Sequence, residues 1–271
     1  MLVINLSHYE RLLGSASRSG FYNNCFLMPD VIPHLCKEHM LYCSEENSGV
    51  FFFRKSGAGT SLMLAVDAKE FHFDVQKYED FLPLKCDFPS NNDKYAPNAV
   101  ICMERLAEVG FVTCMNVKRL VYYPKIDVWH HALSVDTAGI NQAKHILSLW
   151  EATFDRVMSD LPTYDELVTF LKAERVFFCK DTDDSITGAV LFKQEGKIGW
   201  IWHVAVRCDK RRMGIGKALM AKVYQKGLEA GVKVFRLWAQ SANEEAYYKE
   251  YTADGRTSRR MMYQYNVKVG K

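Results

Sequence analysis

One stretch constrains this chain more than any other: Val204–Met220 reads VAVRCDKRRMGIGKALM. An apolar run typical of a β-strand ends at Val206, a basic turn follows, and Gly214 and Gly216 lead into an amphipathic pattern. A helix that begins near Gly214 leaves its first backbone N–H groups without intrahelical partners, and the helix dipole attracts negative charge there. The order of strand, turn and helix therefore predicts an anion-binding site.

The turn adds two features that suit a phosphate group. Glycines allow a bulky anion to approach the backbone because they carry no Cβ atom. Three consecutive basic side chains add positive charge at the rim: Lys210, Arg211 and Arg212. Together these features predict a cradle for a phosphate or a pyrophosphate.

Two other phosphate motifs do not fit the spacing. A Walker loop requires GxxxxGK[ST], but here Lys217 follows GIG and is itself followed by Ala218, so the hydroxyl that would bind magnesium is missing. A dinucleotide fingerprint requires GxGxxG directly after the strand, but GIGKAL lacks the third glycine and lies too far from Val206. We therefore exclude both motifs.

The remaining pattern is [RQ]xxGxG/A between a strand that ends in VAV and an amphipathic helix, with Arg211, Gly214 and Gly216 at its fixed positions. This pattern resembles the acetyl-CoA signature of the GNAT superfamily of acyl-CoA-dependent N-acetyltransferases. The resemblance covers residues 127–271, where the expected order of strands and helices is also the GNAT order. An ordinary basic turn before a helix is the alternative.

The resemblance implies a set of cofactor-binding residues. In the family, the strand before the loop pairs with the pantetheine arm, and the amides of the loop and of the helix start hold the pyrophosphate. The corresponding residues here are Val204, Ala205, Val206, Arg211, Arg212, Met213, Gly214, Ile215, Gly216, Lys217 and Asn243. The resemblance thus implies acetyl-CoA as the acyl-donor substrate and no metal.

The resemblance also implies a tyrosine that protonates the departing thiolate. The segment SANEEAYYKEYTADGR, residues 241–256, departs from the family pattern, so that different alignments place Glu250, Tyr248 or Tyr251 where the tyrosine belongs. We prefer Tyr248 as the general acid. Aromatic packing is the alternative role for both residues.

No residue stands out as the general base. His203 titrates in a useful range, but alternation along the strand would place Trp200, Trp202 and Val204 on one face and His203 on the other. We expect a structural His203, with a water chain or a carboxylate of the N-terminal half as the base. The base is therefore left open.

A second pattern occurs twice at a constant offset. Ser48–Val66 reads SGVFFFRKSGAGTSLMLAV, and Glu174–Phe192 reads ERVFFCKDTDDSITGAVLF. Each predicts a β-hairpin. Two copies of one α/β domain are the simplest interpretation, and chance similarity between two hairpins is the alternative. Only the second copy has the glycine pair, because the first has PSNNDKYAPN before Ala99.

The predicted fold class is α/β (α+β), with two GNAT-like domains that are each a mixed, mostly antiparallel sheet flanked by helices. Residues 1–126 would form a degenerate domain without a cofactor loop, and residues 127–271 the acetyltransferase domain. We expect a strand at Val128–Leu133 and helices at Pro29–Tyr42, Thr137–Phe154 and Tyr164–Ala173.

Composition limits the partners and the compartment. The net charge of +3 over 271 residues is too small to indicate a nucleic-acid partner. No apolar run reaches the roughly 18 to 20 residues of a membrane helix. Eight cysteines without a CxxC pair are typical of reduced, mostly buried thiols rather than of a disulfide framework. We therefore expect a cytoplasmic protein without a membrane or nucleic-acid partner.

These observations predict an N-acetyltransferase that transfers an acetyl group from acetyl-CoA to a primary amine of a small molecule or peptide. A non-catalytic acyl-CoA-binding or regulatory module is one alternative, and an acyltransferase that uses longer acyl-CoA is another. The acceptor, the role of the N-terminal domain and the oligomeric state are left open.

Overall fold

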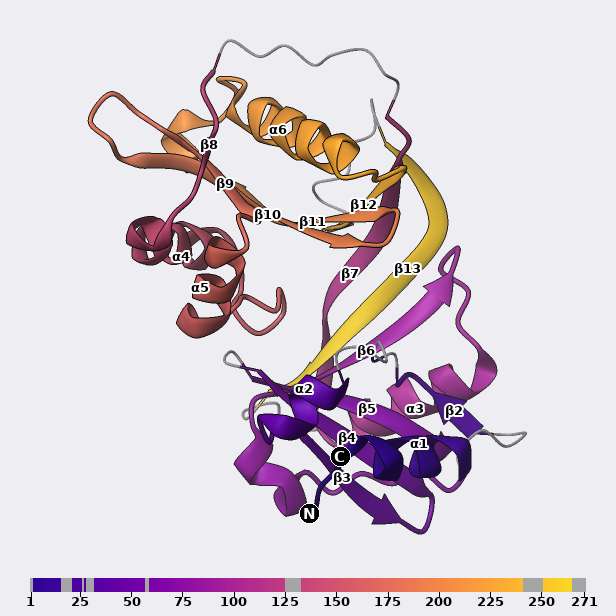
Figure 1. Ribbon diagram of the computed structural model, residues 1–271. Coiled ribbons are helices and arrows are strands. Elements are labelled where there is room, and N and C mark those ends of the chain that lie inside the picture. Colours follow the sequence, from indigo (N-terminus) through magenta and orange to yellow (C-terminus); the bar gives the residue numbers. More distant parts are fainter. Residues whose placement is uncertain are drawn as a thin grey trace. The chain divides into compact units, whose positions relative to one another are not determined.

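The chain forms two compact units in the computed structural model, which describes residues 2–15, 21–25, 27, 32–56, 59–124, 133–240 and 251–264 (Figure 1). The first unit comprises the residues up to Val117 together with those from Gly255 onward, and the second unit is Lys118–Asp254. The predicted boundary between residues 126 and 127 lies outside the described residues. The C-terminal strand, which the sequence assigned to the second domain, belongs mainly to the first unit.

The first unit contains a mixed sheet. Within it the strand order is β1-β3-β4-β5-β6-β13, and the short strand β2 pairs with β5. The pairs are antiparallel except for β5 with β6, which run parallel. The strands are β1 (Leu2–Val3), β2 (Phe21–Asn23), β3 (Leu41–Glu46), β4 (Gly49–Ser56), β5 (Gly59–Asp67), β6 (Leu84–Asn91) and β13 (Thr252–Tyr263).

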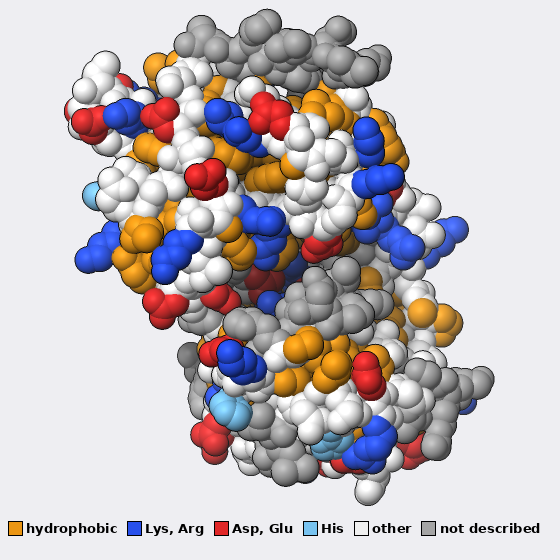
Figure 2. Space-filling model, viewed as in Figure 1, with side chains coloured by type: hydrophobic (Ala, Val, Ile, Leu, Met, Phe, Trp, Pro, Cys, Tyr) orange, Lys and Arg blue, Asp and Glu red, His pale blue; other side chains and the backbone are white. Residues whose placement is uncertain are grey.

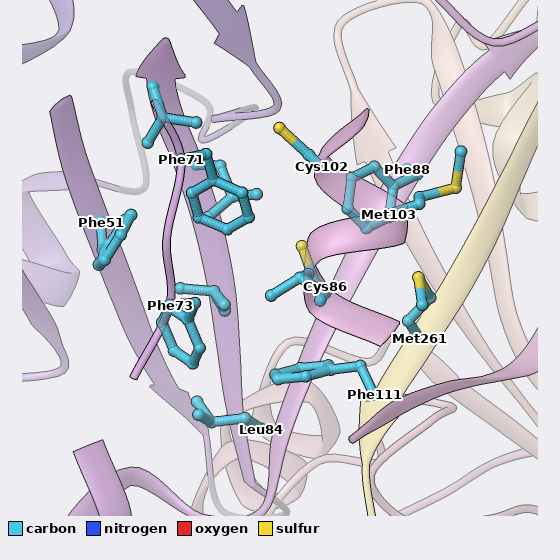
Figure 3. Close-up of a cluster of buried hydrophobic side chains, with 14 of the residues drawn as sticks. Phe51, Phe71, Phe73, Leu84, Cys86, Phe88, Cys102, Met103, Phe111 and Met261 are labelled. Atoms are coloured by element: carbon cyan, nitrogen blue, oxygen red, sulfur yellow. The ribbon is translucent and has the colours of Figure 1, made fainter. Parts of the chain in front are cut away.

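Helices cover both faces of this sheet because its central strands are apolar on both sides. In β4, Val50 and Phe52 pack in the cluster with α1 (Leu6–Ser15) and α2 (Ile32–Lys37). Phe51 and Phe53 face the opposite cluster, which contains α3 (Pro97–Glu108) and the 3-10 helix η1 (Val75–Phe81). Figure 3 shows part of this second cluster, where phenylalanines meet the side chains of Cys86 and Cys102.

The second unit repeats the mixed arrangement. Its strand order is β12-β11-β10-β9-β8, antiparallel except for the parallel pair β11 with β12. The strands are β8 (Asp136–Thr137), β9 (Val176–Lys180), β10 (Ile186–Glu195), β11 (Ile198–Val206) and β12 (Val234–Gln240). The strand β7 (Phe111–Tyr122) contributes residues to both units.

Helices again cover both faces. One cluster joins the sheet to α4 (Ala143–Thr153) and α5 (Tyr164–Lys172), and the other joins it to α6 (Ile215–Glu229). The start of α5 is fixed by a capping box, in which Thr163 and Glu166 bond each other's backbone N–H groups. Both units are therefore mixed, mostly antiparallel sheets flanked by helices, as the sequence predicted.

Several predicted elements are confirmed and others need correction. The two repeated segments form the hairpins β4–β5 and β9–β10, and α5 and α6 occur where they were expected. The helix predicted at Pro29–Tyr42 is wrong at its C-terminal end. His39 adopts a left-handed φ of 53°, and β3 begins at Leu41. The first strand expected at Val128–Leu133 lies almost wholly outside the described residues.

Two further findings concern the whole described chain. All eight cysteines are free, and five of them are buried, in agreement with the predicted reduced thiols. None of the helices in the described ranges is long and apolar enough to cross a membrane.

Candidate functional site

The turn between β11 and α6 presents an uncapped helix start. A single 3-10 turn, η3 (Cys208–Lys210), follows β11, and α6 begins at Ile215. Gly214 occupies the N-cap position with a left-handed φ of 82°, and no side chain caps the helix. The first turn of α6 contains no acidic residue. The helix start that the sequence predicted is present, and its N–H groups are suited to an anion.

Neither glycine of the turn is packed tightly against other described residues. Outside its immediate neighbours, a Cβ atom at Gly214 would meet Leu133 Cδ1 first, at 3.9 Å. A Cβ atom at Gly216 would meet Val206 Cγ2 first, at 3.8 Å. Packing within the described protein therefore leaves room for an external group against this backbone, which fits a phosphate group better than a buried packing role.

The basic side chains of the turn divide into two groups. Lys210 Nζ lies 2.5 Å from Asp181 Oδ2, and Arg207 Nε lies 2.7 Å from Asp209 Oδ1. The bond from Lys210 lowers the pKa of the Asp181 carboxyl. Lys210 was expected to add positive charge for a ligand, but Asp181 already neutralises it.

The other basic side chains of the turn remain available to a ligand. Arg211, Arg212 and Lys217 are exposed, and Arg211 Nε is 3.4 Å from the Val206 carbonyl oxygen. Figure 2 shows blue Lys and Arg side chains mixed with red carboxylates over the unit that contains α6, rather than a continuous basic face. The positive charge is thus local to the turn.

The base of the turn is anchored to the hairpin β9–β10. Arg207 donates its backbone N–H to the Thr187 carbonyl oxygen at 2.8 Å and its Nη1 to Ser185 Oγ at 3.1 Å. Asp181, which holds Lys210, lies at the start of the same hairpin turn. These contacts fix the path of the chain from β11 into α6.

Gly188 of β10 is a positioning residue that the sequence reasoning missed. A Cβ atom there would lie 2.7 Å from Ile215 Cγ2 and 3.1 Å from Leu219 Cδ1. The first turn of α6 therefore packs closely on the sheet, which is possible only over a glycine. A glycine in the middle of an apolar run was the available signal.

A bulge in β11 changes which side chains share a face. His203 has a left-handed φ of 48°, and the register with β10 shifts between Ala189 and Leu191. Trp202 packs in the α4–α5 cluster, whereas Val204 and Val206 pack in the α6 cluster. The expectation that Trp202 and Val204 share a face is therefore wrong, because the bulge interrupts strict alternation.

Aromatic rings surround His203 on the α4–α5 face. Its ring centroid lies 5.4 Å from that of Trp150, 6.0 Å from Phe154 and 5.8 Å from Trp202. Lys193 Nζ lies 3.7 Å from the Trp202 ring centroid, a cation–π distance. This face thus combines aromatic rings with a held ammonium group next to the bulge.

The pairing of β11 with β12 covers a short stretch within the described residues. Ile198–Trp200 pairs in parallel with Val234–Arg236, and the pairing of the two strands ends there. The remaining residues of β11, which include Val204, Ala205 and Val206, continue to the turn before α6. An extended ligand could therefore pair with the backbone of β11 on the side of β12.

The structure separates the two candidate tyrosines. Tyr251 is 3% exposed in the core of the second unit, and its hydroxyl is hydrogen-bonded to the hydroxyl of Tyr224 on α6. This arrangement is typical of a packing residue. Tyr248 and the predicted cofactor-binding Asn243 lie outside the described residues. Within the described ranges, no cluster of three or more His, Cys, Asp or Glu residues could hold a metal ion.

The sequence matches a known family over part of its length. The family model for the acetyltransferase (GNAT) family matches residues 143–250, which include α4, α5, β9 to β12 and the turn with its two glycines. None of the curated proteins compared with the chain matches it.

Solved structures share the fold at low sequence identity. A GCN5-related N-acetyltransferase from Sphaerobacter thermophilus is 16% identical, with a TM-score of 0.53, over 79% of this chain and 77% of that one. A GCN5-related N-acetyltransferase from Kribbella flavida is 11% identical, with a TM-score of 0.55, over 82% and 89%. The glucosamine N-acetyltransferase region of a fungal GH3 β-N-acetylglucosaminidase is 14% identical, with a TM-score of 0.60, over 80% and 31%. Each alignment covers more of this chain than its second unit contains.

Proposed function

Because residues 143–250 match the model of the acetyltransferase (GNAT) family, we propose that this chain is an N-acetyltransferase that moves an acetyl group from acetyl-CoA to a primary amine. The observation that carries the proposal is the uncapped start of α6 at two glycines that are not packed tightly against other described residues. Such a site suits the pyrophosphate of the donor. The match to a family of acetyltransferases supports the reaction class, and we assign the donor and the class of acceptor.

The donor would lie along β11 and the turn. The backbone of Val204, Ala205 and Val206 would pair with the pantetheine arm, where the recorded pairing with β12 has ended. The pyrophosphate would accept bonds from the amides of Arg212–Lys217, and the exposed guanidinium groups of Arg211 and Arg212 would add charge-assisted bonds. Asn243 is assigned a supporting contact from the sequence.

The chemistry is a direct transfer. The neutral amine attacks the thioester carbonyl carbon, a C–N bond forms, the C–S bond breaks, and the thiolate leaves with the electron pair. The ammonium must first lose a proton, and the thiolate must gain one. We assign the second step to the hydroxyl of Tyr248. Tyr251 is assigned a structural role because its buried hydroxyl already bonds Tyr224.

The acceptor is assigned only by class, as a small molecule or a peptide with a primary amine. The aromatic face around His203 and Trp202 lies next to the bulge of β11, on the sheet face opposite α6. The rings of this face attract an ammonium group, as the contact of Lys193 with Trp202 illustrates. The free thiols support a reducing, cytoplasmic location.

A non-catalytic acyl-CoA-binding module is the second candidate. The observation in its favour is the burial of Tyr251, which leaves Tyr248 as the sole tyrosine assigned to acid catalysis. Such a module would bind the donor through the same turn without transferring the acyl group.

Titration with acetyl-CoA, followed by thiol-release assays with amino acids, polyamines, amino sugars and peptides, distinguishes the candidates. We expect saturable binding and thiol release with at least one class of amine. Binding without release on any class would favour the module. Tighter binding and faster transfer with longer acyl-CoA would identify a different donor. Absence of CoA binding would overturn the proposed function.

A further inference from the structure

In each unit two parallel strands pair over a short stretch, and we call the region between these strands beyond that pairing the wedge. In each, an antiparallel meander ends in a strand that pairs in parallel with the next strand: β5 with β6 in the first unit, and β11 with β12 in the second. The recorded parallel pairing covers three residues of β5, Thr60–Leu62, and three residues of β11, Ile198–Trp200. Aligned on this wedge, β4–β5 corresponds to β10–β11. The sequence repeat instead aligned β4–β5 with β9–β10, one strand out of phase.

The wedge of the first unit is filled by the chain itself. Because β4 occupies the whole of one edge of β5, the strand β2 must lie on the other edge, the one that faces β6. There Phe21–Asn23 pairs with Ala65–Asp67 in antiparallel register. The part of β5 beyond its pairing with β6 is therefore covered by backbone from the N-terminal region.

Asn24 closes the wedge by bonding to both of its walls. Its backbone N–H donates to the Leu64 carbonyl oxygen at 3.0 Å, and its Oδ1 accepts from the Leu64 N–H at 2.5 Å. Its Nδ2 donates to the Asp87 carbonyl oxygen of β6 at 2.8 Å. Asn24 is 5% exposed, so one buried side chain joins the backbones of β5 and β6.

Apolar packing holds the same segment in place. The Tyr22 ring stacks on Phe88 of β6 with centroids 5.6 Å apart, and Cys25 Sγ lies 3.6 Å from the Leu64 carbonyl oxygen. Figure 3 shows Phe88 and Cys86 of this wall within the same cluster as Phe71 and Phe73.

The connection between β5 and β6 also differs from its counterpart. The second unit places the 15-residue helix α6 between its parallel strands, with an uncapped start. The first unit places the 3-10 helix η1 there, and the side chain of Asp74 caps it by accepting from the Gln76 N–H. A capped 3-10 turn preceded by a carboxylate offers no comparable site for a pyrophosphate.

We propose that Phe21–Cys25 acts as an internal plug, occupying in the first unit the place that the second unit keeps for the acyl-CoA arm. The protein then binds one acyl-CoA per chain, and the first unit cannot take a second. The stoichiometry rests on the proposed function, whereas the presence of the plug rests on the contacts of Phe21–Cys25 with β5 and β6.

Two measurements on the full chain test the proposal. Calorimetric titration with acetyl-CoA should give one site per chain. Amide hydrogen exchange should show the Leu64 N–H strongly protected, with the same rate in the absence and presence of saturating acetyl-CoA. Two sites per chain, or a Leu64 rate that falls when acetyl-CoA binds, would overturn the plug.

Matched variants sharpen the exchange measurement. Asn24→Ala removes the acceptor for Leu64 and should speed its exchange by about tenfold or more. Asn23→Ala is the control, because the Asn23 side chain bonds only the Cys25 N–H within the same segment at 2.8 Å and should leave the Leu64 rate nearly unchanged. If Asn24→Ala does not fold, Asn24→Asp takes its place. It removes the donor to the Asp87 carbonyl oxygen and to Cys86 Sγ and places a buried carboxylate beside that carbonyl, so it should also speed Leu64 exchange. Equal Leu64 rates in all folded variants would contradict the bridge.

The two proposals can fail separately. A protein that binds no acetyl-CoA would refute the proposed function. Slow exchange at Leu64 would then still support the plug, and fast exchange would overturn it.

Discussion

The wedge between β5 and β6 and the wedge between β11 and β12 share a strand plan but differ in what occupies them. In the first, β2 and Asn24 bond the strand backbones, and the aromatic side chains of η1 fill one face. In the second, the recorded pairing ends at Trp200, and the following turn ends in an uncapped helix. A shared topology therefore does not imply a shared site, because the backbone groups of a splayed parallel pair need partners that either the chain or a ligand supplies.

The contrast also concerns charge. The first wedge is closed by neutral groups, with an amide side chain as the bridge. The second ends beside Arg211 and Arg212, which are exposed, while Lys210 is bonded to Asp181. The second unit thus keeps exposed positive charge at the turn where a phosphate would bind, whereas the first wedge has a neutral amide in the corresponding place.

The largest effect is expected from Gly214→Val. A valine at φ 82° is strained by about 1–2 kcal/mol, and its side chain would fill the space in front of the helix start. We expect acetyl-CoA affinity to fall by about 100-fold or more, since the amides and the dipole act together at this position. Calorimetry measures the affinity. Gly196→Val is a matched control, because Gly196 also has a positive φ, 56°, with no atom within 4 Å, and lies in the β10–β11 turn.

The outcome also bears on the first wedge. If acetyl-CoA still binds to a folded Gly214→Val protein with unchanged affinity, the turn is not the donor site. If one of two sites survives, the first wedge is not closed.

The next effect is on turnover. Tyr248→Phe removes the assigned acid and should lower kcat by about 10- to 100-fold with little change in acetyl-CoA affinity. Tyr251→Phe breaks the bond to Tyr224 and should lower the free energy of unfolding by about 1 kcal/mol while kcat is nearly unchanged. Steady-state kinetics and thermal unfolding on both variants decide the roles. A larger loss of kcat in Tyr251→Phe would reverse the assignment.

A smaller effect should separate the basic residues of the turn. Arg212→Ala should weaken acetyl-CoA binding by about tenfold, because an exposed guanidinium forms charge-assisted bonds to phosphate. Lys210→Ala should weaken it less than about threefold, because Asp181 already neutralises the ammonium. The difference should shrink as salt is raised from low to high concentration. Equal losses in the two variants would show that Lys210 leaves Asp181 to contact the ligand.

The smallest predicted effect is on the acid stability of the first unit. Burial alone would raise the pKa of Glu46, but hydrogen bonds from Lys77, Tyr78 and Ser44 lower it to about 2. A lowered folded-state pKa stabilises the protein above the ordinary value of 4.5, and this contribution is lost as the pH falls from 4.5 toward 2. After allowance for solvent screening, the contribution is about 1 kcal/mol.

Acid unfolding followed by hydrogen exchange measures this contribution in each unit. Glu46→Gln should reduce the pH dependence in the first unit and leave the second unit unchanged. Glu70→Gln, at an exposed carboxylate, is the control and should change neither. If the stability of the first unit depends on pH identically in the wild type and in Glu46→Gln, Glu46 does not contribute to acid stability.

Much of the second unit could be predicted because its signals are local. The strand that ends in VAV, the paired glycines and the helix start occupy adjacent positions, and the structure places the N-cap at Gly214 as expected. Both repeated hairpins form for the same reason, since alternating apolar residues around a polar turn determine them locally. The helix predicted at Pro29–Tyr42 was wrong at its end because Leu41 and Cys43 belong to the next hairpin, where they pair with Arg54 and Phe52 of β4.

The details of both sites depended on contacts between distant residues. The bulge at His203 arises from the register of β11 against β10, which no spacing within one strand reveals. The neutralisation of Lys210 depends on Asp181 in another hairpin, and the close approach of α6 depends on Gly188 in β10.

By itself, the sequence determined the fold class, the position of the uncapped helix start and its resemblance to an acyl-CoA site, because each rests on the chemistry of neighbouring residues. Only the tertiary structure decided which basic side chains remain available, which tyrosine is buried and which wedge is filled. The physical reason is that a backbone edge or a charged side chain is available to a ligand only when no other part of the folded chain bonds it. Asn24 is separated from Leu64 and Asp87 by dozens of residues in the chain, and only folding brings the three together.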